Sequence, residues 1–318
     1  MDDALLSALR RLPAFDFVDP TAQRSKLAQL TKDAPAAAPD ERVVTQDHQV
    51  LRPDGSSIMA RSYRPVERIG PLPLVLWFHG GGFVFGNVDV DDPFCADLAV
   101  GTGTVVLSTE YRLAPEYPYP AGLDDCYDVT VWAAANPDAV DGNGALAVAG
   151  GSAGGNLAAA VALLARDRSG PDIAFQALLC PAIAHQVPDS AHIYERATSV
   201  IVPSDNEHML AHYLGTNREQ IPPYAMPSLA TDLAGLPATY LLAAGRDYLR
   251  FAGVQYAIAL DQAGVQVELH LVPDVPHGFD AIAPNAPLRS AFEASTTAQL
   301  AQPSLPRNRE RRNGWVTP

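Results

Sequence analysis

The strongest constraint on the fold is a regular alternation of short apolar runs with helical segments, which begins at residue 72. Six runs rich in valine and leucine cover residues 72–78, 104–109, 145–150, 175–180, 238–244 and 267–272. They are apolar on both sides of the pleat, as is typical of parallel strands that helices cover on both faces. Helical patterns lie between the runs, at residues 121–135, 154–168, 250–263 and 285–300. The alternation predicts an α/β fold, a doubly wound and mostly parallel sheet with right-handed crossovers.

Other parts of the chain depart from this alternation. Residues 4–12 and 21–31 have the helical spacing of apolar residues, and a linker rich in proline and alanine follows them. Residues 183–235 lie between two core strands and contain no clear strand, but they include one helix-like stretch. They are too many for a simple loop. The predicted organisation is a cap at 1–41 and 183–235, a core at 42–182 and 236–302 that starts with a β-hairpin over 42–64, and a basic, solvated tail at 303–318.

Charge and composition restrict the partners of the chain. With 22 basic and 36 acidic residues, its net charge is −14, which disfavours nucleic acid because neutralising phosphates needs clustered positive charge. A long apolar run is missing, so neither a membrane span nor a signal peptide is predicted. Cys95, Cys126 and Cys180 lack metal-ligand spacing and are expected to be buried thiols in a reducing compartment. We therefore expect a cytoplasmic protein with a small-molecule substrate.

A serine stands at the turn between one predicted strand and the helix that follows. Residues 150–154, GGSAG, fit the pattern G-x-S-x-G directly after the apolar run. This context distinguishes the pattern from a glycine-rich turn with an incidental serine. Such a strained turn needs small neighbours, and it projects the Ser152 hydroxyl from the carboxyl edge of the sheet at the positive end of the helix. Ser152 is the candidate nucleophile.

Three successive glycines follow the first strand of the alternation, in the sequence HGGGF at residues 79–83. Backbone N–H groups of glycines can approach a developing oxyanion closely, because no Cβ is present. In lipases and esterases an HGGG loop forms one part of the oxyanion hole. A merely flexible turn does not require this sequence one strand–helix–strand unit before G-x-S-x-G. The two patterns together predict acyl-transfer chemistry.

A serine hydroxyl is a weak nucleophile until a general base takes its proton. In α/β-hydrolases the order along the chain is serine, then an acid, then histidine. Asp247 follows the strand at 238–244, and His277 lies in a loop beyond the strand at 267–272. Ligands bind at the carboxyl ends of strands in open sheets, so both side chains are placed within reach of Ser152.

Rival residues fit these two roles less well. Asp274 is the chief rival acid, but it precedes His277 by only three residues. His79 belongs to the glycine loop, where a structural hydrogen bond is expected. His208 and His212 are spaced i, i+4 on one helix, but they lack the glutamate of an H-E-x-x-H zinc motif. We interpret that pair as part of a solvated face and predict no metal.

Five motifs occur in order along the chain: HGGGF at 79–83, YRLAPE at 111–116, GGSAGGN at 150–156, GRDYLR at 245–250 and HGF at 277–279. This set resembles the hormone-sensitive-lipase-like carboxylesterases (the bacterial HSL family) of the α/β-hydrolase superfamily, over about residues 42–300. The resemblance implies an α/β-hydrolase fold with a helical cap, and an enzyme that needs no cofactor.

The resemblance also implies the roles of single residues. It makes Ser152 the nucleophile, Asp247 the acid and His277 the base. It assigns the oxyanion hole to the backbone N–H groups of Gly81, Gly82 and Ala153. One departure concerns the common G-D-S-A-G-G motif, in which this chain has Gly151 in place of aspartate. A polar anchor beside the nucleophile is thereby lost.

The predicted activity is that of a serine carboxylesterase, which hydrolyses short- to medium-chain soluble esters through an acyl-enzyme intermediate. The side chains expected to wall the substrate pocket are aromatic or apolar: Phe83, Phe85, Met209 and Tyr213. Hydrolysis of a lactone or a carbamate, and acyl transfer to an alcohol, fit the same residues. A rival of another class is a non-catalytic ligand-binding receptor on the same fold; plant hormone receptors of this kind lose the histidine that is present here. A peptidase with an added propeller does not fit the length.

The strand at 267–272 is expected to be the last in the sheet. An exposed strand edge can pair with a second chain. A homodimer is therefore one predicted assembly.

Overall fold

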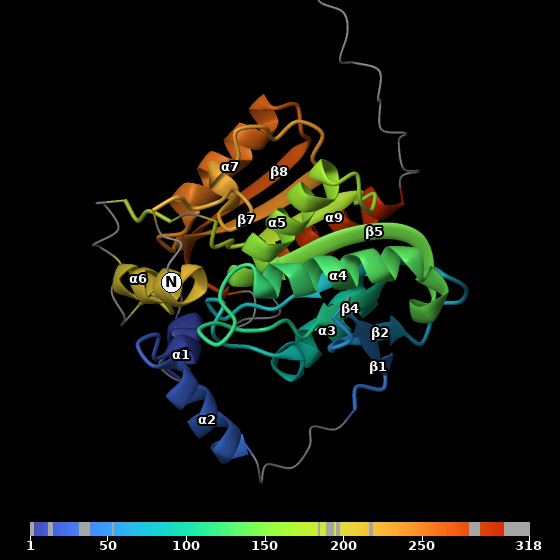
Figure 1. The fold of residues 1–318 in the computed structure, drawn as a ribbon, viewed down its shortest axis with the longest axis horizontal. Coiled ribbons are helices and arrows are strands. Elements are labelled where there is room, and N and C mark those ends of the chain that lie inside the picture. Colours follow the sequence, from blue (N-terminus) through green and yellow to red (C-terminus); the bar gives the residue numbers. More distant parts are fainter. Residues whose placement is uncertain are drawn as a thin grey trace, which may run out of the picture.

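A mixed sheet lies at the centre of the protein (Figure 1). The computed structural model describes residues 3–11, 15–31, 39–52, 54–183, 185–188, 194, 198–215, 219–279 and 287–301. Within these residues eight strands are hydrogen-bonded in the order β1-β2-β4-β3-β5-β6-β7-β8. They are β1 (Val43–Leu51), β2 (Ser57–Pro65), β3 (Leu72–Phe78), β4 (Val105–Thr109), β5 (Gly142–Gly151), β6 (Phe175–Leu179), β7 (Ala238–Arg246) and β8 (Val267–Pro276). The strands from β4 to β8 in this order are parallel.

The two antiparallel contacts come from the predicted hairpin. Strands β1 and β2 pair from Val43↔Pro65 to Leu51↔Ser57, and β2 then pairs antiparallel with β4. Asp54 Oδ1 accepts a hydrogen bond from the Ser56 N–H at 2.9 Å, which is the local bond that favours aspartate in turns. The hairpin prediction is thus confirmed, and it extends the parallel sheet at one side.

Helices cover both faces of the sheet. Helices α4 (Ala121–Ala135), α5 (Ala153–Asp167) and α7 (Arg250–Gln262) supply buried side chains to one hydrophobic core. Helices α3 (Val88–Thr102) and α9 (Pro287–Leu300) contribute to a second core. The remaining helices are α1 (Asp3–Arg11), α2 (Pro20–Thr31) and α6 (Pro203–Leu214), with short 3-10 helices at Pro137–Val140 and Pro227–Leu229. In Figure 1, α1, α2 and α6 lie at the same side of the molecule.

Strand β3 shows why the apolar runs have no polar side. Leu74, Leu76 and Phe78 belong to the first core, whereas Val75 and Trp77 belong to the second. Successive side chains of a strand point to opposite faces, so a strand covered on both faces must be apolar at every position. This arrangement confirms the predicted α/β class.

Two expectations about single elements are corrected. Strand β8 is the edge strand, as predicted, but it is not covered on both faces, because Leu269 and Leu271 are 39% and 51% exposed. Helix α3 has no counterpart among the predicted helices. Its first turn contains Asp89 and Asp91, and Pro93 lies inside it. These residues interrupt the apolar spacing in the sequence, so the buried face of the helix, which includes Cys95, could not be recognised from it.

The predicted cap lies partly outside the described residues, and the predicted tail at 303–318 lies wholly outside them. Its described parts include the helices α1, α2 and α6, joined by segments without regular structure. No described helix is long and apolar enough to cross a membrane.

Candidate active site

Ser152 is the single residue between strand β5 and helix α5, and its backbone is strained. Its φ and ψ are 55° and −116°, a backbone conformation that residues other than glycine rarely adopt. The chain can reverse here because Gly150 and Gly154 lack side chains. A Cβ atom on Gly154 would overlap the carbonyl oxygen of Phe78, and one on Gly150 would lie 2.7 Å from the same oxygen. The elbow therefore packs directly against the end of β3.

Gly151, the departure from the family motif, is under no such restriction. A Cβ atom there would meet nothing within 4 Å, and its φ is not positive. The residue is partly exposed. A side chain at this position would have room beside the nucleophile, so the elbow itself does not require glycine here.

The glycine loop after β3 lies against this elbow. A Cβ atom on Gly80 would lie 3.6 Å from the Ser152 Cβ. Gly81, Gly82 and Phe83 have positive φ values of 114°, 62° and 66°. Within the described residues, neither Gly81 nor Gly82 donates its N–H to another backbone group. Both donors, together with the first N–H of α5, are available to a ligand at the serine.

The YRLAPE segment at residues 111–116 holds the glycine loop. The Tyr111 hydroxyl donates a hydrogen bond to the His79 carbonyl at 2.8 Å, and the two rings stack with centroids 4.1 Å apart. The Ala114 N–H donates to the Phe83 carbonyl at 3.0 Å. Burial lowers the pKa of His79. His79 thus has the structural position that was expected for it.

Asp247 and His277 meet at the carboxyl ends of β7 and β8. His277 Nδ1 lies 2.6 Å from Asp247 Oδ2, and the two residues are only 6% and 1% exposed. The carboxylate accepts, so Nδ1 carries the proton and Nε2 is left as an acceptor. The second carboxylate oxygen accepts the Leu249 N–H at 2.9 Å, which fixes its orientation. The rival acid, Asp274, is paired instead with Arg246 at 2.6 Å on the surface.

The elbow is also tied to the chain segment that follows β6. The Ser152 N–H donates to the Leu179 carbonyl at 2.8 Å, and the Ala182 N–H donates to the Ser152 carbonyl at 2.9 Å. Asn156, the last residue of GGSAGGN, donates from Nδ2 to the carbonyls of Ala182 and Ala225 at 2.9 and 3.0 Å. The elbow therefore contacts the ends of β3 and β6.

Comparisons with known proteins agree with this geometry. A family model described as the alpha/beta hydrolase fold matches residues 75–281. The esterase LipI of Mycobacterium tuberculosis is 38% identical over 312 residues, which cover 95% of this chain and 94% of LipI. The carboxylesterase NlhH of the same organism is 38% identical over 263 residues, which cover 80% of this chain and 81% of NlhH. The chain belongs to the hormone-sensitive-lipase-like carboxylesterase family.

A solved structure reinforces this membership. The structure of a bacterial heroin esterase matches with a TM-score of 0.84 at 34% identity, and the match covers 94% of this chain and 96% of that one. The predicted family and the α/β-hydrolase fold are confirmed. The protein is a carboxylic ester hydrolase.

The predicted pocket residues of this esterase fall into two groups. Phe83 and Tyr213 stack on each other with ring centroids 3.7 Å apart and are buried in the first core. Phe85 and Met209 belong to a smaller cluster that also contains Phe17. The second group borders the glycine loop. A Cβ atom on Gly82 would lie 2.5 Å from Met209 Sδ and 2.8 Å from Phe17 Cε1.

Phe17 is a residue that sequence reasoning missed. It lies between α1 and α2, more than sixty positions before the glycine loop, and its backbone carbonyl accepts a hydrogen bond from His212 Nε2 at 3.0 Å. That contact joins the N-terminal segment to α6. His212 therefore binds the backbone of the N-terminal segment, and its ring is only partly exposed.

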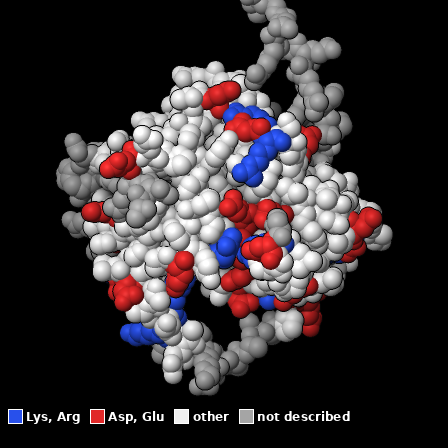
Figure 2. Space-filling view, in the orientation of Figure 1, with Lys and Arg blue, Asp and Glu red and all other residues white. Residues whose placement is uncertain are grey.

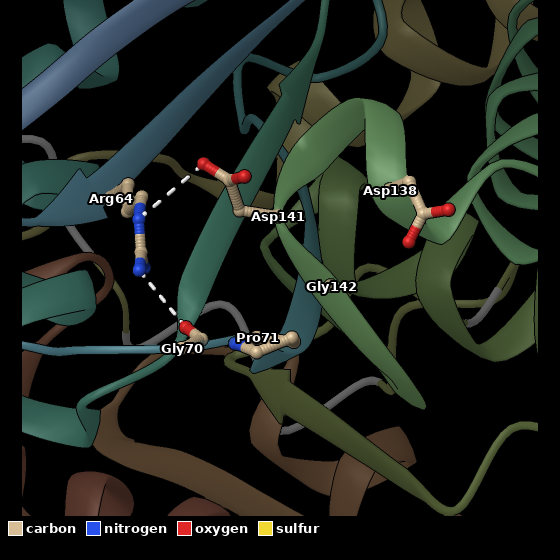
Figure 3. A pocket seen from close by; sticks show the side chains of 6 residues that line it. All are labelled: Arg64, Gly70, Pro71, Asp138, Asp141 and Gly142. Atoms are coloured by element: carbon tan, nitrogen blue, oxygen red, sulfur yellow. Dashed lines mark hydrogen bonds and ion pairs between the residues drawn. The ribbon is translucent and has the colours of Figure 1, made fainter.

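A separate surface pocket of about 400 Å³ lies at the opposite edge of the sheet, where β3 and β5 begin (Figure 3). Arg64 spans its rim, with Nε 3.4 Å from Asp141 and Nη2 2.9 Å from the Gly70 carbonyl. Its lining includes no serine, histidine or cysteine. It offers no nucleophile for ester hydrolysis.

Potential metal ligands come together at one place within the described residues. Cys180, Asp247 and His277 each offer one ligand atom, and these atoms lie within 4.8 Å of one another. Their spacing along the sequence does not reveal this cluster. No local pattern could have found it, because the three residues follow three different strands.

Proposed function

We propose that this esterase is a serine carboxylesterase with Ser152 as nucleophile, His277 as general base and Asp247 as the acid that orients the histidine. The observation that carries the proposal is the buried 2.6 Å hydrogen bond between His277 Nδ1 and Asp247 Oδ2. It leaves Nε2 as an acceptor at the edge of the sheet where the strained Ser152 elbow lies. Three strand ends thus supply the three groups that acyl transfer by serine requires.

The reaction proceeds in two steps. His277 Nε2 takes the proton of the Ser152 hydroxyl as its oxygen attacks the ester carbonyl, and then gives that proton to the leaving alcohol. A water molecule then attacks the acyl-enzyme, again with His277 as base. The Asp247 carboxylate stabilises the imidazolium that forms in each step.

The oxyanion of each tetrahedral intermediate is bound by the N–H groups of Gly81, Gly82 and Ala153. Each such donor is worth about 3 kcal/mol of transition-state stabilisation. The donors are preorganised, because Tyr111 and Ala114 hold the glycine loop through its two flanking carbonyls. Little reorganisation is needed when charge develops on the oxygen.

The proposed substrates are esters with short to medium acyl chains. Phe17, Phe85 and Met209 crowd the glycine loop, and this crowding favours a compact acyl group. We expect p-nitrophenyl butyrate to be hydrolysed with a higher kcat/KM than p-nitrophenyl decanoate. A steady rise of kcat/KM from acetate to decanoate would contradict the proposed chain length.

The catalytic assignment is tested by Ser152→Ala. We expect turnover of p-nitrophenyl butyrate to fall by about four orders of magnitude or more, because the nucleophile is gone. Circular dichroism must show an unchanged fold in the same sample. The matched control is Ser169→Ala, at a serine that follows α5 away from the strand ends. Full turnover by a folded Ser152→Ala protein would overturn the assignment.

We also propose that β8 pairs with β8 of a second chain to form a homodimer. This edge strand exposes Leu269 and Leu271, and Ile258 on neighbouring α7 is 50% exposed. Light scattering during size exclusion should give twice the chain mass, and Leu271→Arg should give the monomer mass. A monomer for the unaltered chain would contradict the dimer.

The cytoplasmic location stays a prediction, while the three cysteines are buried thiols as expected.

A further inference from the structure

Cys180 lies beside the nucleophile without a role in the proposed reaction. It follows β6, and the chain on both sides of it is hydrogen-bonded to the elbow, through the Leu179 carbonyl before it and the Ala182 N–H two residues after it. Its own N–H donates to the Leu242 carbonyl on β7 at 2.7 Å, and its φ is 44°. The backbone thereby fixes a thiol at the strand ends where Asp247 and His277 also lie.

The three side chains form a set of metal ligands of mixed chemistry. Their ligand atoms lie within 4.8 Å of one another, and Cys180, Asp247 and His277 are 4%, 1% and 6% exposed. A thiolate, an imidazole nitrogen and a carboxylate oxygen are the ligand types of zinc sites with three protein ligands and one open position. A hard cation such as Mg²⁺ prefers oxygen ligands only, so the sulfur selects against it.

We propose that Cys180, Asp247 and His277 form a binding site for a thiophilic divalent cation, Zn²⁺ or Cd²⁺, and that a cation bound there inhibits the esterase. Burying a divalent cation is costly unless its charge is matched. Here one thiolate and one carboxylate carry two negative charges, which neutralise the ion. The site therefore satisfies the charge requirement with residues that are already in place.

Ligand separations set the movement that binding requires. With metal–ligand bonds of about 2.0–2.3 Å, two ligand atoms on one tetrahedral ion are roughly 3.4–3.6 Å apart. The Asp247–His277 separation of 2.6 Å must widen by about 1 Å, and the atoms farthest apart, at up to 4.8 Å, must close by a similar amount. These are shifts that side-chain torsions can absorb.

Inhibition follows from the tautomer of His277 and rests on the proposed function. The cation takes the thiol proton's place on Cys180, and this proton is released to solvent. It also takes the place of the proton on His277 Nδ1, and that proton moves through solvent to Nε2. A histidine that is protonated on Nε2 has no lone pair there to accept the Ser152 proton. Because one proton is released, binding should tighten as the pH rises.

Binding is tested first without any turnover. CdCl₂ is titrated into metal-free Ser152→Ala protein, and the ultraviolet charge-transfer band of a cadmium–thiolate bond is followed. We expect the band to saturate at one equivalent, to be lost when Cys180→Ser is added to Ser152→Ala, and to persist when Cys126→Ser is added instead. Cys126 is the matched control, since it is an equally buried thiol that lies on α4.

Inhibition is then measured with p-nitrophenyl butyrate, as a fraction of each variant's own metal-free rate. We expect the Cd²⁺ or Zn²⁺ concentration for half-inhibition to rise about tenfold or more in Cys180→Ser, and to be unchanged in Cys126→Ser. MgCl₂ at the same concentrations should not inhibit.

Two results would overturn the proposal: a cadmium band that persists without Cys180, or full activity at a Cd²⁺ concentration that saturates the band. The failure of the proposed function would look different. Undiminished turnover by Ser152→Ala would refute the nucleophile, whereas the absorption titration would still report whether the cation binds.

Discussion

At the residue scale, the site depends on which positions tolerate a side chain and which do not. Gly154 and Gly150 must be glycine, because a Cβ atom at either position would clash with the Phe78 carbonyl oxygen at the end of β3. In the proposed triad Asp247 must be a carboxylate, because one of its oxygens accepts a hydrogen bond from the Leu249 N–H and the other accepts one from His277 Nδ1. Gly151 is constrained by neither requirement.

The choice between the two candidate acids can be tested by matched amide substitutions. Asp247→Asn should lower kcat by about four orders of magnitude, because the amide stabilises the wrong tautomer of His277 and not its protonated form. Asp274→Asn should change kcat by less than about threefold, since it breaks an exposed ion pair with Arg246. The kinetics of p-nitrophenyl butyrate hydrolysis give both values. Equal losses in the two variants would reject Asp247 as the acid.

Two substitutions in one motif test the packing of the elbow. Gly151→Asp restores the common family residue into open space, and we expect the free energy of unfolding to change by less than about 0.5 kcal/mol. Gly154→Ala places a methyl group against the Phe78 carbonyl and should cost about 3 kcal/mol. Urea denaturation measures both. An elbow that accepts alanine at residue 154 without loss would contradict the described contact with β3.

At the scale of elements, the catalytic groups are aligned by loops that follow strands. The HGGG loop is held from outside by the YRLAPE segment, which makes one hydrogen bond to each end of it. The same segment anchors α4 through Arg112, which together with Arg52 binds the fully buried Asp125. The β-hairpin, the loop after β4 and helix α4 are thereby joined at one carboxylate.

Removing one support of the loop should weaken catalysis more than stability. Tyr111→Phe deletes the hydroxyl that binds the His79 carbonyl, a hydrogen bond worth about 1 kcal/mol, so kcat should fall about fivefold with little change in KM. Tyr117→Phe, directly after the same motif, is the control, because Tyr117 is 51% exposed. If both variants keep the full kcat, the segment does not position the oxyanion donors.

The sequence predicts elements better than it predicts their contacts. Six strands were located because burial on both faces leaves a continuous apolar run, and the candidate triad followed from the order of its motifs. Helix α3 was missed, since Asp89, Asp91 and Pro93 obscure its periodicity. The supports supplied by Tyr111 and Phe17 join segments that are far apart in the chain, and no local pattern encodes such contacts.

At the scale of the whole molecule, charge is distributed in pairs. On the face shown in Figure 2, basic side chains lie among acidic ones and do not form a continuous patch. Arg61 contacts three carboxylates, those of Asp47, Asp89 and Asp92. The net charge of −14 remains, and at long range it disfavours anionic esters.

The N-terminal segment is held to the core partly by such a pair, which makes its docking pH-dependent. Arg24 Nη2 donates to Glu116 Oε1 at 2.7 Å, and this hydrogen bond holds the pKa of Glu116 below its usual value. A lowered folded-state pKa means that the stabilisation is present above the usual carboxyl pKa and is lost as the pH falls through the lowered value.

At pH 7, Glu116→Gln should therefore speed amide exchange in α2 about two- to fivefold, and the difference from the unaltered chain should disappear as the pH falls through the lowered pKa of Glu116. Exchange in α2 is measured relative to α4 in the same sample. Glu67→Gln, at an exposed carboxylate, is the control. A difference that stays constant down to pH 3 would exclude the ion pair as its cause.

The central claim is that Ser152 becomes covalently acylated, and site-resolved labelling with a fluorophosphonate tests it most directly. The reagent phosphonylates an activated serine, so the peptide that contains residue 152 should gain one phosphonyl group in step with the loss of esterase activity. Complete inactivation with the label on another residue, or an active enzyme that is fully labelled at Ser152, would contradict the account.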